Sequence, residues 1–387
     1  MKGLRLSFNI LQEVGKIQME SNDNKSFTLK KLDISDLSEL QLFVDFPKQL
    51  YQEKIQFNNF YLKLPGILKS NPSHSCYLLL KGSEKKIIGR MAAGINPAIV
   101  DEQGVPYGQI GLFEVIEDFE AFSFMITEAE HLLSGSKNIL FPFFVSTWHN
   151  YRMTTKEEFN FFLEQPCKLY YGKFIQKYGY DTSYIYKSSF NDNLDKIEEK
   201  NLASFKKAEE RGVKFRNFDK TKWEEELKIL YGISCEAFKE NPFYSEISLE
   251  GFLDLYRGSL KIIDEKLITI AFSADNKPIG FIFCLPDLTV QFQTCKLDTI
   301  TGKIKFFLTR KKTKTMILKS TCMLKECRNS GVYGSMVYQQ ARYARSIGYT
   351  NMIGAFYSAA NVSQKILAET LYENEYKLFT LKQKEII

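Results

Sequence analysis

Histidine and paired cysteine are scarce in this sequence of 387 residues. The three histidines stand far apart, and the seven cysteines are an odd number with no C-x-x-C spacing among them. Structural zinc sites need Cys and His at short intervals, and a disulfide framework needs cysteines in pairs. The sequence therefore predicts neither a metal site nor a disulfide scaffold.

Long hydrophobic runs are missing as well. The sequence has no run of about 18 consecutive apolar residues, so it predicts no membrane-spanning helix. Residues 1–26 lack the apolar core and cleavage site of a secretory signal. We expect them to be a flexible N-terminal segment of a cytoplasmic protein, with peripheral contact at the inner membrane surface as an additional option.

Aromatic and apolar residues are plentiful, with 32 Phe, 21 Tyr and 44% hydrophobic residues in all. A globular chain of this length is expected to form two domains of ordinary size. The polar stretch 191–200 is the predicted linker between domains at 27–190 and 201–387. The net charge of +6 permits an anionic partner, but no recognised nucleic-acid-binding module accompanies it, so no nucleic acid is expected. The oligomeric state is left open.

The segment 316–349 has the pattern of a strand, a turn and a helix. Residues 316–324 are largely apolar, and residues 333–347 carry apolar side chains at helical spacing before Gly348, a residue typical of helix C-termini. Backbone N–H groups at a helix N-terminus attract anions, and the helix dipole adds to this effect. The turn at 328–334 is therefore a candidate phosphate site.

This turn resembles motif A of the GNAT N-acyltransferases, which hold the pyrophosphate of acetyl- or acyl-coenzyme A. The family pattern is Arg or Gln, two residues, Gly, one residue, and then Gly or Ala. Arg328 and Gly331 match the pattern, whereas Tyr333 takes the place of the small residue and Gly334 follows one position late. The resemblance implies acetyl-CoA or a longer acyl-CoA as co-substrate. The cofactor-binding residues that it implies are Met323 and Leu324 at the strand edge, Arg328, Asn329, Ser330, Gly331, Val332, Tyr333 and Gly334 in the turn, and Asn361 at the start of the next helix.

Predicted elements follow the same order in both halves, including hairpins that turn at 82–85 and 275–277. Phrases such as FVDFPKQLY and NPFYSEISLEGFLDLY resemble bacterial two-domain GNAT-like acyltransferases. The resemblance implies an α/β (α+β) protein of two tandem GNAT-like domains, with mixed, mostly antiparallel sheets flanked by helices. The turn in the first half, residues 114–120, has four carboxylates and no Gly or basic residue. Because carboxylates repel pyrophosphate, we expect a degenerate first domain that braces the second and walls the acceptor cleft.

The family also implies a chemistry, the transfer of an acyl group to an amine of a small molecule or lipid, for example a sphingoid base. The amine must lose a proton to a base. Glu326 and Asp287 end predicted strands and are the candidate bases, although each could be an ordinary turn residue. The family's thiolate-protonating Tyr falls on Ala368 here, and Tyr372, one helical turn further on, is the candidate acid.

Three residues outside the motif are candidates for binding the acceptor. Phe243 and Tyr244 either cover the acceptor cleft or cap the core. His149 either reaches across the domain interface as a base or has a structural role. Covalent catalysis is not expected, because the sequence shows no base positioned to activate Cys322 or Cys327 as a nucleophile.

A basic insert at 296–319 contains eight Lys or Arg residues and one acidic residue, Asp298. Apolar residues interleave with the charges, among them Ile304 and Phe307. One interpretation is a solvated hairpin. The other is a patch for the coenzyme A 3′-phosphate, an acyl carrier protein or an anionic membrane surface.

Two alternatives to acyl-CoA chemistry stay open. The related tandem fold of peptidoglycan cross-bridge synthesis implies an aminoacyl-tRNA donor and no coenzyme A. A non-catalytic tandem scaffold is the other alternative, and Tyr333 and Ala368 are the residues that favour it.

Overall fold

The computed structural model describes residues 26–51, 60–155, 161–162, 164, 166–260, 262–297, 299–328, 330–359 and 374–386. Several predictions concern positions outside these ranges. These positions are the N-terminal segment up to residue 25 and Asp298, Asn329, Asn361, Ala368 and Tyr372.

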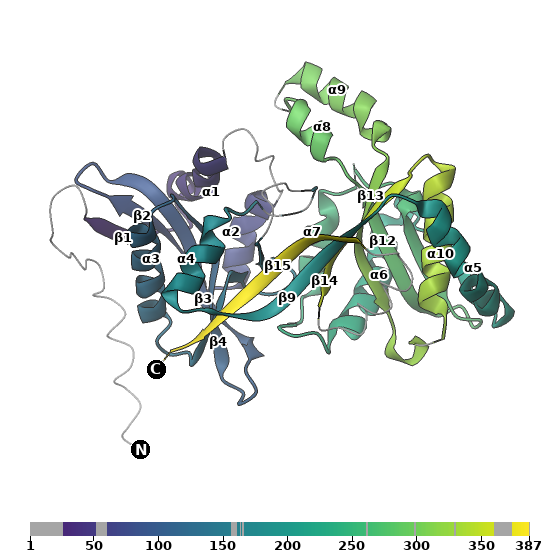
Figure 1. Ribbon diagram of the computed structural model, residues 1–387, viewed down its shortest axis with the longest axis horizontal. Coiled ribbons are helices and arrows are strands. Elements are labelled where there is room, and N and C mark those ends of the chain that lie inside the picture. The colour runs from purple at the N-terminus through teal and green to yellow at the C-terminus, as the bar shows by residue number, and fades with distance from the viewer. Residues whose placement is uncertain are drawn as a thin grey trace.

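A single mixed sheet runs through both halves of the chain (Figure 1). Its strand order is β1-β2-β3-β4-β5-β15-β9-β14-β13-β12-β11-β10, with β8 paired to β15. Among the described strands, β4 pairs with β5 and β13 with β14 in parallel, and the other pairings are antiparallel. The predicted mixed, mostly antiparallel α/β architecture is confirmed, although one sheet spans both halves.

The first lobe consists of the elements that precede β9. They are β1 (Phe27–Lys31), α1 (Leu37–Tyr51), α2 (Phe60–Ser70), β2 (Ser75–Lys81), β3 (Lys86–Val100), β4 (Pro106–Val115), α3 (Phe119–Leu132), β5 (Asn138–Phe141), β6 (Phe143–Phe144), β7 (Asn150–Tyr151), β8 (Met153–Thr154) and α4 (Tyr170–Tyr178).

The second lobe follows β9 (Asp181–Asn191) and ends before the C-terminal strand β15 (Asn374–Glu385). Its elements are α5 (Leu194–Glu210), β10 (Lys214–Asn217), η2 (Lys220–Lys222), α6 (Trp223–Phe238), α7 (Leu249–Arg257), η3 (Glu265–Leu267), β11 (Ile268–Phe272), β12 (Pro278–Pro286), α8 (Thr289–Thr294), α9 (Ile300–Thr309), η4 (Arg310–Lys312), β13 (Thr315–Met323), η5 (Lys325–Cys327), α10 (Val332–Ser346) and β14 (Asn351–Ser358).

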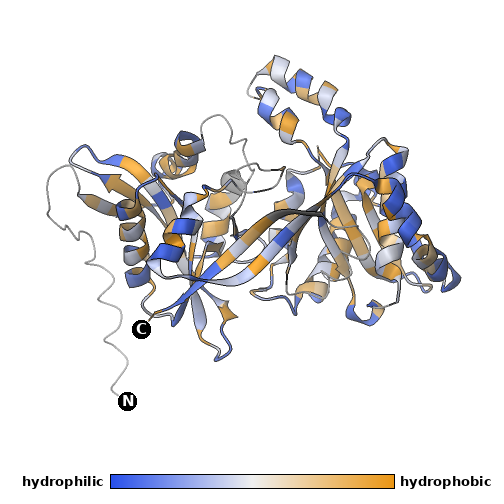
Figure 2. Cartoon of the chain, viewed as in Figure 1, coloured by the Kyte–Doolittle hydropathy of each residue, from blue (hydrophilic) through white to orange (hydrophobic). Residues whose placement is uncertain are grey.

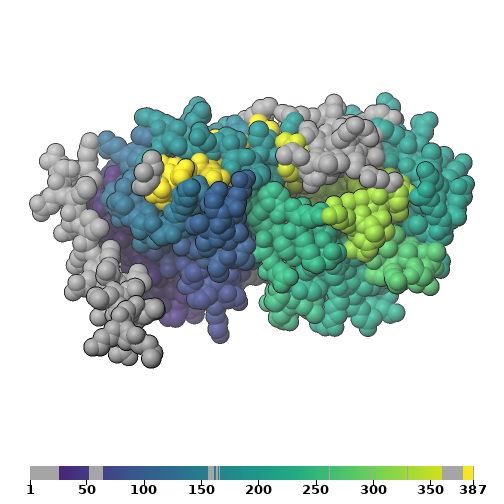
Figure 3. All heavy atoms as spheres, turned by 90° about the horizontal axis from the view of Figure 1, so that it is seen from below, coloured from purple at the N-terminus to yellow at the C-terminus, as the bar shows by residue number. Residues whose placement is uncertain are grey.

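The last strand joins the two lobes. β15 pairs with β5 of the first lobe, where Lys382 lies opposite Phe141, and with β9 on its other side. β9 in turn pairs with β14 of the second lobe. In Figure 3 the yellow atoms of β15 lie among the blue and teal atoms of the first lobe. The C-terminal strand therefore completes the sheet of the lobe that was made first.

The predicted linker at 191–200 is wrong. This stretch is the end of β9 and the first turns of α5, which Asn193 caps by accepting a hydrogen bond from the Lys196 N–H at 3.0 Å. Leu194 and Ile197 are buried in the core of the second lobe. Polar composition suggested a linker, but it describes only the solvent face of this helix, because apolar residues three apart form its buried face.

Helix α10 lies between the sheet and α5. Met336 and Val337 pack into the core beneath it. On the other side the Ser335 Oγ donates to the Ser204 carbonyl at 2.7 Å. A Cβ atom at Gly334 would lie 2.9 Å from the Asn201 Oδ1 and from the Ser204 Oγ. Gly334 therefore allows α5 and α10 to approach closely.

Aromatic side chains fix the first lobe against the second. The Trp148 Nε1 donates to the Ser245 carbonyl at 2.9 Å, and its ring meets Phe238 and Phe252 edge-on at 5.7 and 5.8 Å between centroids. In the opposite direction, the Phe243 ring meets Tyr107 and Phe143 of the first lobe edge-on, each at 5.6 Å between centroids. Each lobe thus inserts an aromatic ring into its neighbour.

The basic insert is helical, so the predicted hairpin is wrong. α8 and α9 project from the second lobe beside the start of β13 (Figure 1). The Thr299 Oγ1 accepts from the Gly302 N–H at 3.0 Å and caps α9. Large apolar residues in this insert recur at helical spacing, as Ile300, Ile304 and Phe307, and not in the alternation of a strand. No helix within the described ranges is both long and apolar enough to cross a membrane.

Candidate functional site

The parallel strands β13 and β14 separate halfway along their length. They pair from Thr315 opposite Asn351 to Leu318 opposite Gly354, and no further. Beyond that point β13 continues against β12, and β14 continues against β9 after a register shift between Gly354 and Tyr357. No strand among the described residues pairs with residues 319–323 on the side that β14 has left. Backbone groups on such an edge are available to an extended ligand.

The turn that follows β13 leads into a helix without a side-chain cap. Gly331 adopts the left-handed conformation with φ of 86°, and α10 begins at the next residue. The Ser330 Oγ donates to the Cys327 carbonyl, and the Val332 N–H reaches that hydroxyl oxygen only at 3.5 Å. A Cβ atom at Gly331 would meet nothing closer than the Ser204 carbonyl oxygen at 3.9 Å. Among the residues that the structure describes, no side chain therefore fills the space at the N-terminus of α10.

Three cationic side chains surround this turn. The Arg328 guanidinium and the Lys325 ammonium both bind the exposed carboxylate of Glu240, at 3.1 and 2.5 Å. Hydrogen bonds from Lys325 and Arg328 lower the pKa of Glu240. The Arg211 Nη1 donates to the Ser330 carbonyl at 3.0 Å. An anion that entered the turn would compete with Glu240 for the first two cations.

The other predicted cofactor residues lie along this path. The Leu324 N–H already donates to the Ile279 carbonyl at 2.9 Å, whereas Met323 is half-buried at the end of the free edge. Tyr333 packs against the core around Met336. Gly334 faces α5, so packing accounts for this glycine without a cofactor. The predicted cofactor contacts of these residues stay predictions.

The candidate bases lie in different environments. Glu326 is exposed in η5, next to the turn. The Asp287 Oδ1 accepts three hydrogen bonds, from the Thr289 N–H and hydroxyl at 3.1 and 2.5 Å and from the Phe162 N–H at 3.3 Å. These bonds fix the start of α8 and favour the structural interpretation of Asp287. Burial raises the pKa of the Cys322 thiol to about 12, so a thiolate nucleophile is disfavoured there.

The candidate acceptor residues lie at the junction of the lobes. Phe243 joins the apolar cluster that includes Ala355 and Phe356 of β14, so the structure brings it to the strand that separates from β13. Burial raises the pKa of the Tyr244 hydroxyl. The His149 Nδ1 lies 2.9 Å from the Ser146 Oγ, and burial lowers the pKa of the imidazole to about 4. His149 is therefore neutral at pH 7.

In the first lobe the parallel strands β4 and β5 also separate, but here side chains of the same lobe occupy the turn and the helix N-terminus that follow. β4 and β5 pair in parallel only at Gly108 and Gln109. Here Asp118 caps α3, accepting from the N–H groups of Glu120 and Ala121. The Tyr170 hydroxyl donates to the Val115 carbonyl at 2.6 Å. This turn, closed by Asp118 and Tyr170, is the counterpart of the one at Gly331. The degeneracy of the first half stays a prediction.

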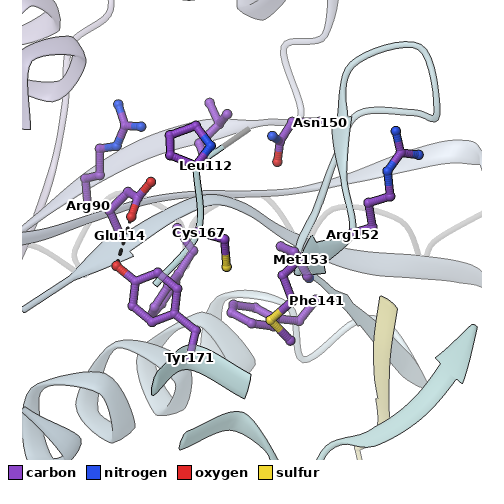
Figure 4. A pocket seen from close by; sticks show the side chains of 12 residues that line it. Arg90, Leu112, Glu114, Phe141, Asn150, Arg152, Met153, Cys167 and Tyr171 are labelled. Carbon is purple, nitrogen blue, oxygen red and sulfur yellow. Dashed lines mark hydrogen bonds between the residues drawn. The ribbon is translucent and has the colours of Figure 1, made fainter. Parts of the chain in front are cut away.

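A small pocket with a buried carboxyl group lies beside this closed turn (Figure 4). Glu114 accepts hydrogen bonds from the Tyr171 and Tyr51 hydroxyls at 2.8 and 2.9 Å. Burial raises the pKa of Glu114 to about 7, although the charge of Arg90 opposes the shift. The volume of about 40 Å³ holds a few water molecules, since roughly 10–15 Å³ suffices for one. The pocket is too small for a coenzyme.

The sequence interpretation missed both Glu114 and Glu240 as site residues. Glu114 was counted only among the carboxylates of the turn, although its place in a strand could have indicated an inward direction. Glu240 meets Arg328 across 88 positions of sequence. No local pattern signals such a contact.

These features define a class of fold. The chain has a tandem GNAT-like fold, in which each half of the sheet contains a parallel pair of strands that separates along its length, with a helix after the first strand of that pair.

Comparisons with known proteins agree on the fold. No protein-family model matches the chain, and no curated protein matches it. The GCN5-related glucosamine N-acetyltransferase region of a fungal multi-domain GH3 β-N-acetylglucosaminidase superposes with a TM-score of 0.52 at 12% identity, over 93% of this chain and 38% of that one. A tandem GNAT protein from the clavulanic acid biosynthesis pathway, solved without acetyl-CoA, superposes with a TM-score of 0.51 at 10% identity, over 93% of this chain and 98% of that one. At these identities the likeness concerns the fold alone.

Proposed function

We propose that the second lobe binds an acyl-CoA and transfers its acyl group to an amine. One observation carries the proposal: the uncapped N-terminus of α10 at Gly331 directly follows the free edge of β13. A phosphate site and an edge for an extended chain are thereby adjacent, which suits a pyrophosphate joined to a pantetheine arm. The capped helix α3 of the first lobe offers no such pair.

The described residues fit this co-substrate in distinct roles. Backbone N–H groups after Gly331 would hold the pyrophosphate, and Arg328 and Lys325 would add positive charge once Glu240 is displaced. The free edge at 319–323 would pair with the pantetheine amides. Asn329 and Asn361 remain predicted cofactor contacts.

The reaction needs one proton acceptor near the amine. The amine nitrogen attacks the thioester carbonyl carbon, the C–N bond forms, the C–S bond breaks, and coenzyme A leaves as a thiolate. Glu326 is the favoured base, because Asp287 is engaged by three donors. Tyr372 remains the predicted acid that protonates the thiolate.

The acceptor is proposed to be an amine of a small molecule or lipid, with a sphingoid base as one candidate. Phe243 would line its site, because this ring belongs to the cluster around Phe356 at the lobe junction. Apolar walls of this kind suit an acceptor with a hydrocarbon portion.

Calorimetric titration of acetyl-, octanoyl- and palmitoyl-CoA tests the proposal. The wild type should bind at least one of them, and Arg328→Glu should abolish binding because it places a carboxylate beside the pyrophosphate. Arg342→Glu makes the same charge change on the exposed side of α10 and should bind like the wild type. If the wild type binds none of the three, the acyl-CoA assignment is wrong, and an aminoacyl-tRNA donor becomes the next one to test.

A non-catalytic scaffold is the second candidate, and the Glu240 carboxylate favours it by occupying Arg328 and Lys325. The variant Glu240→Gln distinguishes the acyltransferase from the non-catalytic scaffold. A competent site should bind acyl-CoA several-fold more tightly in this variant, since a competing charge is removed. A site that binds nothing in either form would support the scaffold.

A further inference from the structure

The helices α8 and α9 present an apolar row to solvent. Exposed fractions are 77% for Ile300, 54% for Ile304, 54% for Phe307 and 71% for Leu308, and Val290 on α8 is 64% exposed. The four residues of α9 stand at positions i, i+4, i+7 and i+8, which places them on one face of the helix. In Figure 2 orange segments alternate with blue ones along this projecting pair of helices. Exposed apolar rows of this kind mark interaction sites.

The opposite side of α9 is anchored to the protein. Phe306 is buried with Leu288 and Cys295 in a small cluster of its own. Phe292 of α8 lies 5.2 Å from Phe306 and stacks at 5.0 Å on Phe162 of the first lobe. The exposed row is therefore the outer face of a packed helix.

Positive charge surrounds the apolar row. Between Thr299 and Thr315 the sequence has six basic residues and no acidic one: Lys303, Lys305, Arg310, Lys311, Lys312 and Lys314. Within the part of the chain that the structure describes, no ion pair joins Lys303, Lys311 or Lys312 to a carboxylate. The Arg310 guanidinium lies over the Phe307 ring at 4.8 Å, so charge and apolar surface are interleaved. The surface is amphipathic and basic.

We propose that the α8–α9 pair docks on a lipid bilayer that contains anionic lipids. Ile300, Ile304, Phe307 and Leu308 enter the boundary between head groups and acyl chains, and the lysines contact the head groups. A row of large apolar residues flanked by basic residues on the exposed side of a helix suits the boundary between acyl chains and anionic head groups. A second copy of this chain is disfavoured as the occupant, because two basic faces would repel each other. The proposal concerns this surface alone and stands whether or not the second lobe is an acyltransferase.

Vesicle flotation of the full chain tests the docking. Wild-type protein should float with vesicles of phosphatidylcholine and phosphatidylglycerol, and the fraction bound should fall as salt is added. The triple variant Ile304→Gln/Phe307→Gln/Leu308→Gln should lose at least ~10-fold in partitioning, because its apolar insertion is removed. Leu37→Gln changes a residue of the first lobe that is 75% exposed and should bind like the wild type.

Fluorescence separates insertion from electrostatic adsorption. Phe307→Trp should show a blue shift of its emission when anionic vesicles are added, against the constant signal of Trp148 and Trp223, and Leu37→Trp should show none. The proposal is overturned if the wild type does not float with anionic vesicles or if the triple variant floats equally well. It is also overturned if an acyl carrier protein, and no vesicle, binds the wild type in a way that the triple variant loses.

Discussion

Two glycines of the candidate motif are needed for different structural reasons. Gly331 is needed for its backbone conformation, with φ of 86° and open space around it. Gly334 has no such φ, and it is needed because α5 lies against it. A pattern that counts small residues in a turn treats the two alike, whereas in the structure Gly331 serves a left-handed backbone and Gly334 serves the packing of two helices.

Gly331→Ala should destabilise the protein by about 1 kcal/mol, because L-residues pay a penalty in the left-handed region. The same change should weaken acyl-CoA binding by distorting the first turn of α10. Urea unfolding checks the first effect and calorimetry the second. Gly172→Ala, in α4 with nothing within 4 Å of the added Cβ atom, should instead be neutral or stabilising.

Glu114 should make stability depend on pH. Burial raises the pKa of this carboxyl from 4.5 to about 7 in the folded state, so the folded protein binds a proton that the unfolded chain releases. The contribution of Glu114 to the free energy of unfolding should therefore be fully present below pH 4.5. It should fall by about 3 kcal/mol as the pH rises through 7. Glu114→Gln should remove this part of the slope, as measured by urea unfolding between pH 5 and 8. The exposed Glu117, changed to Gln, should keep the slope of the wild type, and an unchanged slope in Glu114→Gln would contradict the assignment.

At the scale of elements, local turn chemistry predicted well. The hairpins at 82–85 and 275–277 are confirmed as β2–β3 and β11–β12, and Gly82 and Asn276 take the positive φ that such turns need. The linker and the basic insert were mispredicted because both were judged by charge content. The spacing of Leu194 and Ile197, and of Ile300 and Ile304, carried the helical signal.

Gly334→Ala should separate α5 from α10. The new Cβ atom would lie 2.9 Å from the Asn201 Oδ1 and 3.0 Å from the Ser204 Cβ, so the Asn201 side chain must move and α5 must yield at Ser204. We expect a loss of about 1–3 kcal/mol, the usual cost of overpacking. Thermal unfolding measures the loss, and the double variant Gly334→Ala/Ser204→Gly should recover part of it. A single variant as stable as the wild type would show that the two helices are not closely packed.

At the scale of the whole molecule, the candidate site depends on contacts that no local pattern contains. The tandem fold could be predicted from the repeated order of elements. Two contacts could not be predicted, the pairing of β15 with β5 and the ion pair of Glu240 with Arg328, because each joins residues far apart in sequence. The catalytic assignments of Glu326, Asp287 and Tyr372 remain predictions for the same reason, since reactive geometry is made by several distant segments at once.

Trp148→Ala should weaken the association between the two lobes. The variant loses the hydrogen bond to the Ser245 carbonyl and the ring contacts with Phe238 and Phe252. We expect a loss of about 2–3 kcal/mol, below the range for a fully buried aromatic residue because Trp148 is half-buried. Calorimetry should show the melting transition broaden or divide as the lobes uncouple. Trp223→Ala, whose ring packs on Phe218 inside the second lobe, should lower the melting temperature without dividing the transition.

The pairing of the C-terminal strand β15 with β5 of the first lobe has a consequence for synthesis on the ribosome. The edge of β5 at residues 138–141 meets its partner at 382–385, so it stays uncovered until those residues, more than 200 positions later in the sequence, have been translated. An uncovered strand edge invites pairing with other chains. Nascent first lobes on one polysome would thus be exposed to one another until β15 is made, and expression should depend on chaperones that bind the emerging chain more than the size of either lobe would suggest.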